Sequence, residues 1–210
     1  EFVLAELTQT FDNGDLSYFL PLMAQVEQRL GRRPRYGTAD AAFDAFYVYD
    51  YFHSSAHDGF AAVPLRQMGH NRTFNKDGLP LCEAGLPMPQ TGTFTSRTSL
   101  VQHRRGRYGC PLLHPQPNGL TCPIEHAKWP SGGCKTTLPT ADGARQRYLL
   151  DRESEGFHAV FKQRTAVERI YSQAVALGIE RPKLRNRLAI TNINTLTYIL
   201  INLRAIQRVS

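Results

Sequence analysis

Apolar positions follow two kinds of spacing along the first third of the chain. From Leu16 to Leu30 they recur every three or four residues, which predicts a helix that Asp15 could cap and Gly31 could end. Ala41 to His53 is rich in Ala, Phe, Tyr and Val and predicts a second, buried helix. Short apolar runs predict strands at 2–7, 35–40 and 60–65. Strands that alternate with helices are typical of an α/β sheet covered by helices.

The pattern changes after the third predicted strand. Residues 64–139 contain ten of the thirteen prolines and all four cysteines, so a long helix is excluded there. We expect an insertion of short strands and turns, because structureless loops of this length are uncommon in compact domains. Helical spacing resumes near Ala144, is strong from Gly156 to Leu177, and returns in a last apolar helix. The expected parts are 1–65 and 144–210 for the α/β unit, 66–143 for the insertion, and 190–206 for the last helix.

Composition supports a globular chain. Hydrophobic residues make up 41% and charged residues 20%, which excludes a wholly disordered protein. The longest apolar run, Leu196 to Leu203, is far shorter than the ~18 residues of a membrane span. The first residues contain no basic segment and no cleavage site of a secretory signal. We therefore expect a cytoplasmic protein with no membrane partner.

The positive charge is concentrated in the last quarter of the chain. Residues 1–161 contain 16 basic and 16 acidic residues, whereas 162–210 contain 9 basic and 2 acidic residues, which accounts for the net charge of +7. A cationic segment on a neutral body favours an anionic partner, with nucleic acid first. The alternative is a solvated helix face that keeps the protein in solution.

The four cysteines are candidate zinc ligands. Eleven residues separate each neighbouring pair among the last three, and these three stand beside Gly or Pro, where turns can converge on a metal. His103, His114 and His126 could also act as ligands. The spacing lacks a Cys-x2-Cys pair, so four unrelated reduced thiols remain the alternative. The candidate ligands are Cys82, Cys110, Cys122 and Cys134.

Two acidic positions are candidates for chemistry. Asp40 stands where a predicted strand ends and a helix begins, so it is either a helix N-cap or a carboxylate at a carboxyl strand end. Asp44, one turn later, could support it or face solvent. Glu168 lies four residues after Arg164, on the face that Phe161 and Val175 would share. The simplest interpretation of this pair is a surface ion pair.

Two sequence runs resemble the DDE transposases of bacterial insertion sequences. These are Tyr36-Gly-Thr-Ala-Asp40-Ala-Ala-Phe-Asp44 and Arg164-Thr-Ala-Val-Glu168-Arg-Ile-Tyr-Ser-Gln. The second corresponds to the motif Tyr-x2-Arg-x3-Glu-x6-Lys of one large branch. The resemblance covers nearly the whole chain, including the cysteine-bearing insertion and the closing segments at 181–185 and 192–196.

The resemblance implies a fold and a reaction. The fold would be an RNase H-like mixed sheet with flanking helices, and the reaction DNA cleavage and strand transfer with two Mg²⁺ (or Mn²⁺) ions on three carboxylates. Asp40 matches the second acidic residue and Glu168 the third, and both would be magnesium ligands. Arg164 would contact a DNA phosphate or orient Glu168. Two hard cations can activate the attacking oxygen and stabilise the leaving one.

The resemblance also implies DNA partners. Both transposon ends and target DNA would be bound, and the pairing of two ends implies a homodimer by family analogy. Basic residues of the tail would hold backbone phosphates without reading sequence. The expected DNA contacts are Arg164, Arg169, Arg181, Lys183, Arg185 and Arg187.

This chain departs from the family pattern at three positions. The family's first aspartate lies on a strand upstream of one like 2–7, and no acidic residue here stands in that context. Phe161 replaces the motif Tyr, and Val175 replaces the motif Lys. We therefore expect an incomplete, inactive site in this chain. Three interpretations follow: a transposase completed by a preceding segment, a metal-pinned nucleic-acid-binding module without chemistry, and a decayed remnant. Two open carboxylates within about 8 Å of each other would favour the first.

Overall fold

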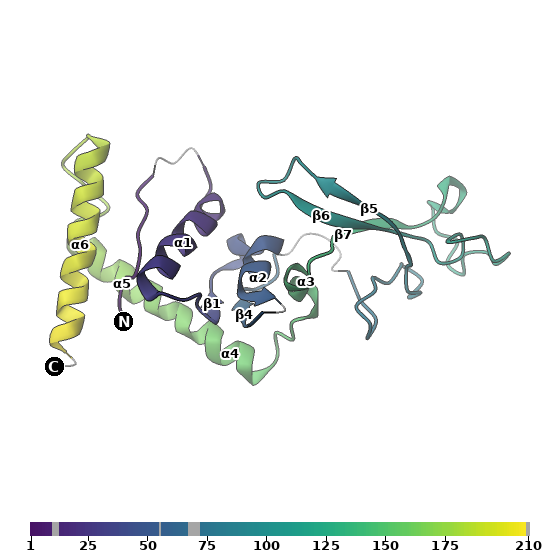
Figure 1. Cartoon of the computed structure of the whole chain (residues 1–210), viewed down its shortest axis with the longest axis horizontal. Helices are drawn as coiled ribbons and strands as arrows, with labels where there is room; N and C mark the ends of the chain where they lie inside the picture. Colours follow the sequence, from purple (N-terminus) through teal and green to yellow (C-terminus); the bar gives the residue numbers. More distant parts are fainter. Residues whose placement is uncertain (10–12, 55, 67–71, 209–210) are drawn as a thin grey trace.

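The computed structural model describes residues 1–9, 13–54, 56–66 and 72–208. The molecule is elongated (Figure 1). The long helix α6 (Arg187–Gln207) lies at one end and a three-stranded sheet at the other, with a small mixed unit between them. The described residues thus form a mixed α/β protein, as the alternating pattern predicted.

The central unit is built around two parallel strands. β1 (Tyr36–Thr38) pairs with β4 (Phe60–Ala62) in parallel, with Thr38 opposite Ala62. A parallel pair needs a crossover connection, which runs through η2 (Ala41–Phe43) and α2 (Phe46–Phe52). A small hairpin of β2 (His53–Ser54) and β3 (His57–Asp58) completes this connection.

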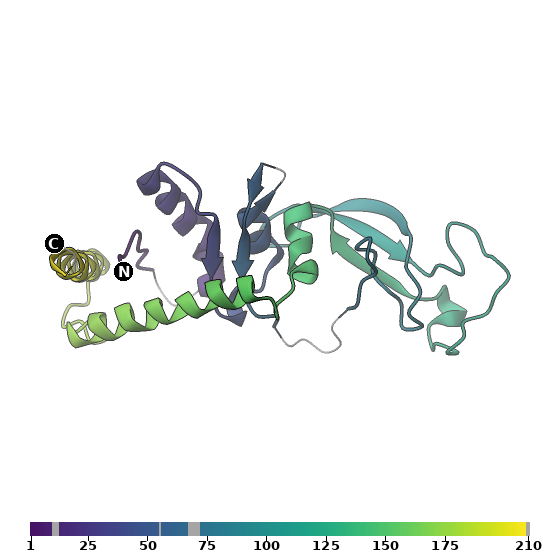
Figure 2. The ribbon, with the colours of Figure 1, turned by 90° about the horizontal axis from the view of Figure 1, so that it is seen from below.

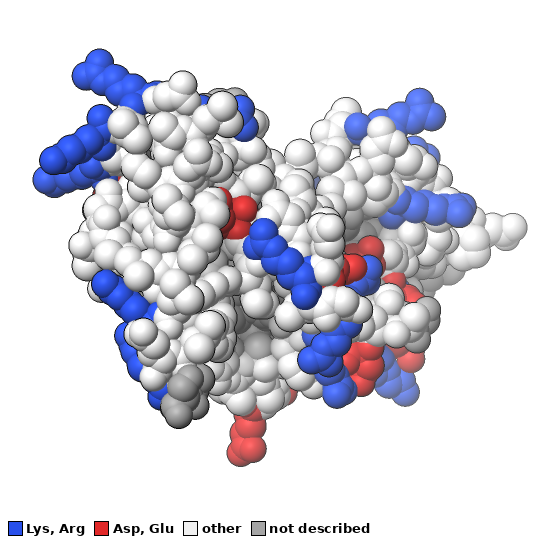
Figure 3. Space-filling model, turned by 60° about the vertical axis from the view of Figure 1, so that its left-hand side comes forward, with Lys and Arg blue, Asp and Glu red and all other residues white. Residues whose placement is uncertain are grey.

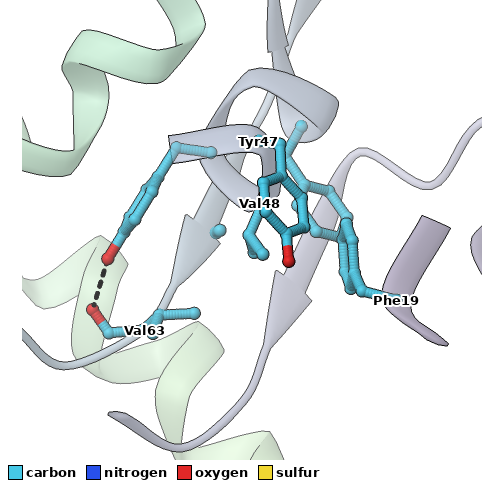
Figure 4. Close-up of a cluster of buried hydrophobic side chains, with 7 residues drawn as sticks. Phe19, Tyr47, Val48 and Val63 are labelled. Atoms are coloured by element: carbon cyan, nitrogen blue, oxygen red, sulfur yellow. Dashed lines mark hydrogen bonds between the residues drawn. The ribbon is translucent and has the colours of Figure 1, made fainter. Parts of the chain in front are cut away.

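An aromatic core holds the central unit together (Figure 4). Phe19 of α1 (Phe19–Leu30) meets the ring of Tyr51 edge to face, with 5.5 Å between centroids. Gly37 of β1 packs directly on α2, since a Cβ there would lie 2.2 Å from Cζ of Phe52. The buried members are Phe19, Tyr47, Val48, Tyr49, Phe52, Ala61 and Val63.

The insertion forms a separate antiparallel sheet. Its strand order is β5–β6–β7, with bounds Gln90–Ser96, His103–Gly109 and Lys135–Pro139. Met88, Tyr108 and Leu138 form a second small core on one face of this sheet. The turns between β6 and β7 include η3 (Trp129–Ser131), and β7 leads into α3 (Asp142–Leu149), which packs against α2.

The C-terminal quarter is helical. α4 (Glu155–Phe161), η4 (Lys162–Arg164) and α5 (Thr165–Ala176) follow one another in one long rod beneath the central unit (Figure 2). α4 contacts both β1 and β4. Asn186 is the N-cap of α6, and its side chain accepts hydrogen bonds from backbone N–H groups of the first turn. A helix is present in each region where spacing predicted one, but the region 41–53 is divided into η2 and the shorter α2, and the region 156–177 into α4, η4 and α5.

The expected strand at 2–7 is wrong. Residues 1–9 contain no strand and run instead along α6. Asn202 accepts a hydrogen bond from the Val3 N–H (2.7 Å) and donates one to the Val3 carbonyl (2.8 Å). A short apolar run predicts extended backbone but not its partner, and here the side chain of Asn202 on α6 satisfies the backbone of Val3.

The structure differs from two further expectations, which concern the cap of the first helix and a single mixed sheet. Gly14, not Asp15, is the N-cap of η1 (Asp15–Tyr18), because Ser17 donates from both its N–H and its hydroxyl to the Gly14 carbonyl. The strands of the described residues form three small sheets, so the single mixed sheet of an RNase H-like fold is not confirmed. No helix among the described residues has the length and apolar character to cross a membrane.

Candidate functional site

Asp40 lies at the junction that the sequence predicted. β1 ends at Thr38, and Asp40 is the N-cap of η2, where its Oδ1 accepts a hydrogen bond of 2.9 Å from the Ala42 N–H. The residue is exposed. Asp40 is therefore both a helix N-cap and a residue at the carboxyl end of a strand, and its carboxylate is open to solvent.

Glu168 lies on α5, beside Arg164. Arg164 Nη2 stands 2.9 Å from Glu168 Oε1, and the side chains are 38% and 58% exposed, so this is a surface ion pair one turn apart. The Arg164 guanidinium also lies over the ring of Phe161, 5.8 Å from its centroid. The shared helix face that the spacing predicted is confirmed for these three residues.

The two carboxylates do not by themselves make a metal site. Within the described ranges, no three His, Cys, Asp or Glu side chains come together as a group that could hold a metal ion. Neither Asp40 nor Glu168 therefore belongs to a three-ligand group among the described residues. Mg²⁺ demands near-octahedral oxygen coordination and is poorly held without it.

Asp44 is the buried carboxylate of this region. Its side chain is 0% exposed and receives a bidentate pair from Arg147 of α3, with 2.8 Å to Nε and 2.5 Å to Nη2. The Tyr49 hydroxyl (2.9 Å) and the Arg66 N–H (2.8 Å) also donate to it. Four hydrogen bonds compensate its burial. Asp44 thus neither faces solvent nor joins Asp40; it fastens the end of η2 to α3.

Arg152 extends this cluster to Val63, the residue that follows β4. It donates to the Tyr49 hydroxyl (3.0 Å), to the Arg147 carbonyl (3.0 Å) and to the Val63 carbonyl (3.1 Å). The cluster therefore fixes the segment after Asp40 against two other elements. Sequence reasoning missed it because Asp44 and Arg147 are 103 positions apart.

The electrostatics of the cluster favour one protonation state. Burial raises the pKa of Tyr49 far above its usual value, and the Asp44 charge adds to the effect. Burial opposes the charge of Arg147, but the hydrogen bonds and charge of Asp44 outweigh it, so the pKa of Arg147 is raised. At neutral pH the hydroxyl is protonated and the arginine charged, as the hydrogen bonds require.

The basic tail is only partly engaged with the rest of the molecule. Arg169 pairs with Glu1, and Arg187 donates to Gln9 at 2.8 Å. Arg181, Lys183 and Arg185 lie exposed between α5 and α6. Figure 3 brings the α6 end forward and shows the Lys and Arg side chains dispersed around a broad uncharged area.

Three of the four cysteines lie in one part of the insertion. Cys82 and Cys134 pack against the second core and line a common cavity of about 410 Å³ with His126. Next to Cys134, a Cβ on Gly133 would lie 2.6 Å from Cβ of Cys110. Loops distant in sequence thus bring these thiols towards one cavity.

The environment of Cys134 shows which thiols are its neighbours. Burial raises the pKa of Cys134, while a hydrogen bond from the Glu83 backbone to its sulfur acts in the opposite direction. The electrostatic influence of Cys82 and Cys110 adds to the increase. A zinc site of all four cysteines stays a prediction: Cys82 and Cys110 lie near Cys134, but no three ligands among the described residues form a group that could hold a metal ion.

Comparison of the chain with protein-family models, with curated proteins and with solved structures gives no match.

Proposed function

We propose that this chain is part of the catalytic region of an insertion-sequence DDE transposase, which cleaves and joins DNA. One observation carries the proposal. Asp40 stands exposed after a strand of a parallel pair, and Glu168 and Arg164 lie on the helical rod whose first helix contacts both strands of that pair. Ligand sites of open α/β sheets lie at carboxyl strand ends.

Each residue has a role in this proposal. Asp40 and Glu168 would supply two of the carboxylates that hold Mg²⁺ or Mn²⁺, and Arg164 would orient Glu168 through their ion pair. The parallel β1–β4 pair with α4 across it would belong to an RNase H-like sheet. Asp44 and Arg147 would act as positioning residues, because they hold the segment after Asp40 in place.

In this proposal Asp40 and Glu168 are two of the three carboxylates of the metal site. The resemblance places the first aspartate on a strand preceding one like 2–7, so the third carboxylate would come from outside residues 1–210. Residues 1–9 would then be the segment that joins that strand to α1.

A nicking assay tests the proposal. The open reading frame would be expressed with enough upstream sequence to include a strand bearing an aspartate, and supercoiled plasmid incubated with Mg²⁺ or Mn²⁺. Asp40→Asn and Glu168→Gln should abolish nicking without loss of DNA binding in a gel-shift assay. Asp58→Asn is the control, since Asp58 is an exposed carboxylate paired with Arg35. Nicking that survives both Asp40→Asn and Glu168→Gln would overturn the assignment.

The second candidate is a nucleic-acid-binding module without chemistry. It is favoured by the partners that both carboxylates already have, since Asp40 caps η2 and Glu168 pairs with Arg164. Zinc in the insertion would stabilise such a module. Metal analysis of the purified chain tests this part, and one equivalent of zinc lost in Cys134→Ser would support it. DNA binding without nicking in the extended protein would favour this candidate, and a stop codon just upstream would favour a decayed remnant.

A further inference from the structure

One face of the insertion sheet is cationic. Side chains alternate along a strand, so His103, Arg105 and Arg107 of β6 share one face, while Gly106 and Tyr108 share the other. The strand register places Phe94 of β5 opposite Arg105, and Thr137 of β7 opposite Arg107. Lys135 lies opposite Gly109, on the same face as the two arginines.

This face is open where the other face is packed. Tyr108 and Leu138 point into the second core and are 4% and 3% exposed. On the cationic face, Arg107 and Lys135 are exposed, and a Cβ added to Gly92 would meet nothing within 4 Å. A cavity of about 590 Å³ opens there, lined by Arg107, His114, Lys135 and Thr137 among others.

The cations of this face are held by neutral groups. Arg105 donates from Nη2 to the carbonyl (2.8 Å) and hydroxyl (3.0 Å) of Thr137, and the Arg107 guanidinium lies 4.8 Å from the ring centroid of Phe94. In the part of the chain that the structure describes, no ion pair within 4.0 Å involves Arg105, Arg107 or Lys135. Their charge is therefore oriented but not neutralised.

The net charge of the insertion sheet and its loops is masked when charges are summed over residues 1–161, because that sum is zero. Residues 90–139 contain six Lys or Arg residues and one acidic residue, Glu125, so their net charge is +5. Acidic residues elsewhere in 1–161 cancel it in the sum. The three described strands of the insertion sheet, β5, β6 and β7, contain no acidic residue.

We propose that this face, defined by Phe94, Arg105, Arg107 and Lys135, binds single-stranded DNA; this rests on the proposed function for its nucleic acid. Arg105 and Arg107 are two positions apart on an extended strand, about 6.6 Å, so their charges can lie beside successive phosphates. Lys135 adds a third cation from the neighbouring strand. The stacked pair of Phe94 and Arg107 offers a platform on which an unpaired base can stack.

The chemistry of the face favours a flexible strand over a duplex. An aromatic ring set among arginines contributes only when the base is unstacked from its neighbours, which a duplex does not allow. In a protein that cuts DNA, such a strand would arise at the opened end. The occupant we commit to is therefore single-stranded DNA, held without sequence preference.

Fluorescence anisotropy with a labelled 20-nucleotide single strand and its duplex, on the 210-residue chain, tests this surface. The double variant Arg107→Gln/Lys135→Gln should bind the single strand about tenfold more weakly, with a salt slope smaller by about 1.4. Phe94→Leu keeps apolar volume and should weaken single-strand binding while leaving duplex binding unchanged.

The matched control is Arg97→Gln/Lys128→Gln, which removes the same charge from exposed positions of the same segment. It should change affinity less than twofold, and circular dichroism should show that every variant is folded. Equal losses in both double variants, or no binding of the single strand by the unchanged chain, would overturn the proposal. Binding lost only in variants of the C-terminal tail would overturn it too, yet would leave the proposed function standing, because nicking reports on that separately.

Discussion

At the scale of single residues, we expect substitution in the buried Asp44–Arg147 pair to have a large effect on the free energy of unfolding. Asp44→Ala leaves Arg147, 19% exposed, without the carboxylate that compensates its burial. Removal of one partner from a buried ion pair costs about 3–5 kcal/mol. We expect a loss of that size in the free energy of unfolding, measured by urea denaturation.

The control for this prediction is a pair with the same chemistry at the surface. Asp58 and Arg35 lie 3.3 Å apart with side chains 90% and 61% exposed. Asp58→Ala should change the free energy of unfolding by less than about 1 kcal/mol. Equal losses of unfolding free energy in the two variants would show that the buried pair of Asp44 and Arg147 contributes no more to stability than a surface pair.

The pKa of Tyr49 gives the pH dependence of this cluster. Because burial raises its pKa in the folded state, the folded chain retains a proton that the unfolded chain loses near its ordinary pKa of about 10. The stabilisation is complete below that pH and falls as pH rises further. Unfolding followed between pH 8 and 11 should show this decline, and Tyr49→Phe should reduce its slope. A slope unchanged by Tyr49→Phe would assign the decline to other tyrosines.

The two aspartates also show what a sequence can predict about a site. The cap at Asp40 was predictable, because an N-cap bonds to a backbone N–H two residues away. The role of Asp44 was not, since its partner lies in α3, beyond an insertion whose length no local pattern constrains. The distant half of a buried pair becomes visible only once the chain has folded.

At the scale of elements, local periodicity predicted the helices well and the strand pairing poorly. α1, α5 and α6 depend on contacts three or four residues apart, which the spacing of apolar positions records directly. β5 and β6 contain seven residues each and are longer than the short strands expected. Their sequences contain few apolar residues, so it is the backbone pairing between the two strands that stabilises them. Residues 2–7 have the pattern of a strand but lie on α6 instead.

The attachment of this N-terminal segment to α6 can be tested at one side chain. Asn202→Ala removes both hydrogen bonds to Val3, and backbone amide exchange at Val3 should then accelerate. Asn192→Ala is the matched control, an exposed asparagine of the same helix. Hydrogen–deuterium exchange with mass spectrometry measures both, and equal protection in the two variants would contradict the contact.

At the scale of the whole molecule, charge is distributed over two surfaces far apart along the elongated shape. The sheet face of the insertion lies towards one end, and the tail around α5 and α6 lies at the other (Figure 1). The net charges of residues 1–161 and 162–210 reveal only the second surface, because acidic residues cancel the charge of the first. A DNA that contacts both surfaces would span the central unit, where Asp40 is exposed.

The tail should contribute affinity without a preference for single strands. Arg181, Lys183 and Arg185 are exposed on an irregular segment, and none of them lies over an aromatic ring of the described residues. Replacing all three by Gln should weaken duplex and single-strand binding alike, and should lower the duplex salt slope by about 2.7, or 0.9 for each phosphate contact. Replacement of Arg32, Arg66 and Lys76, three exposed cations elsewhere, removes equal charge and should leave the slope within about 0.5 of its original value. Anisotropy titrations at several salt concentrations measure these slopes, and similar decreases in both triple variants would show that net charge, rather than the tail, determines binding.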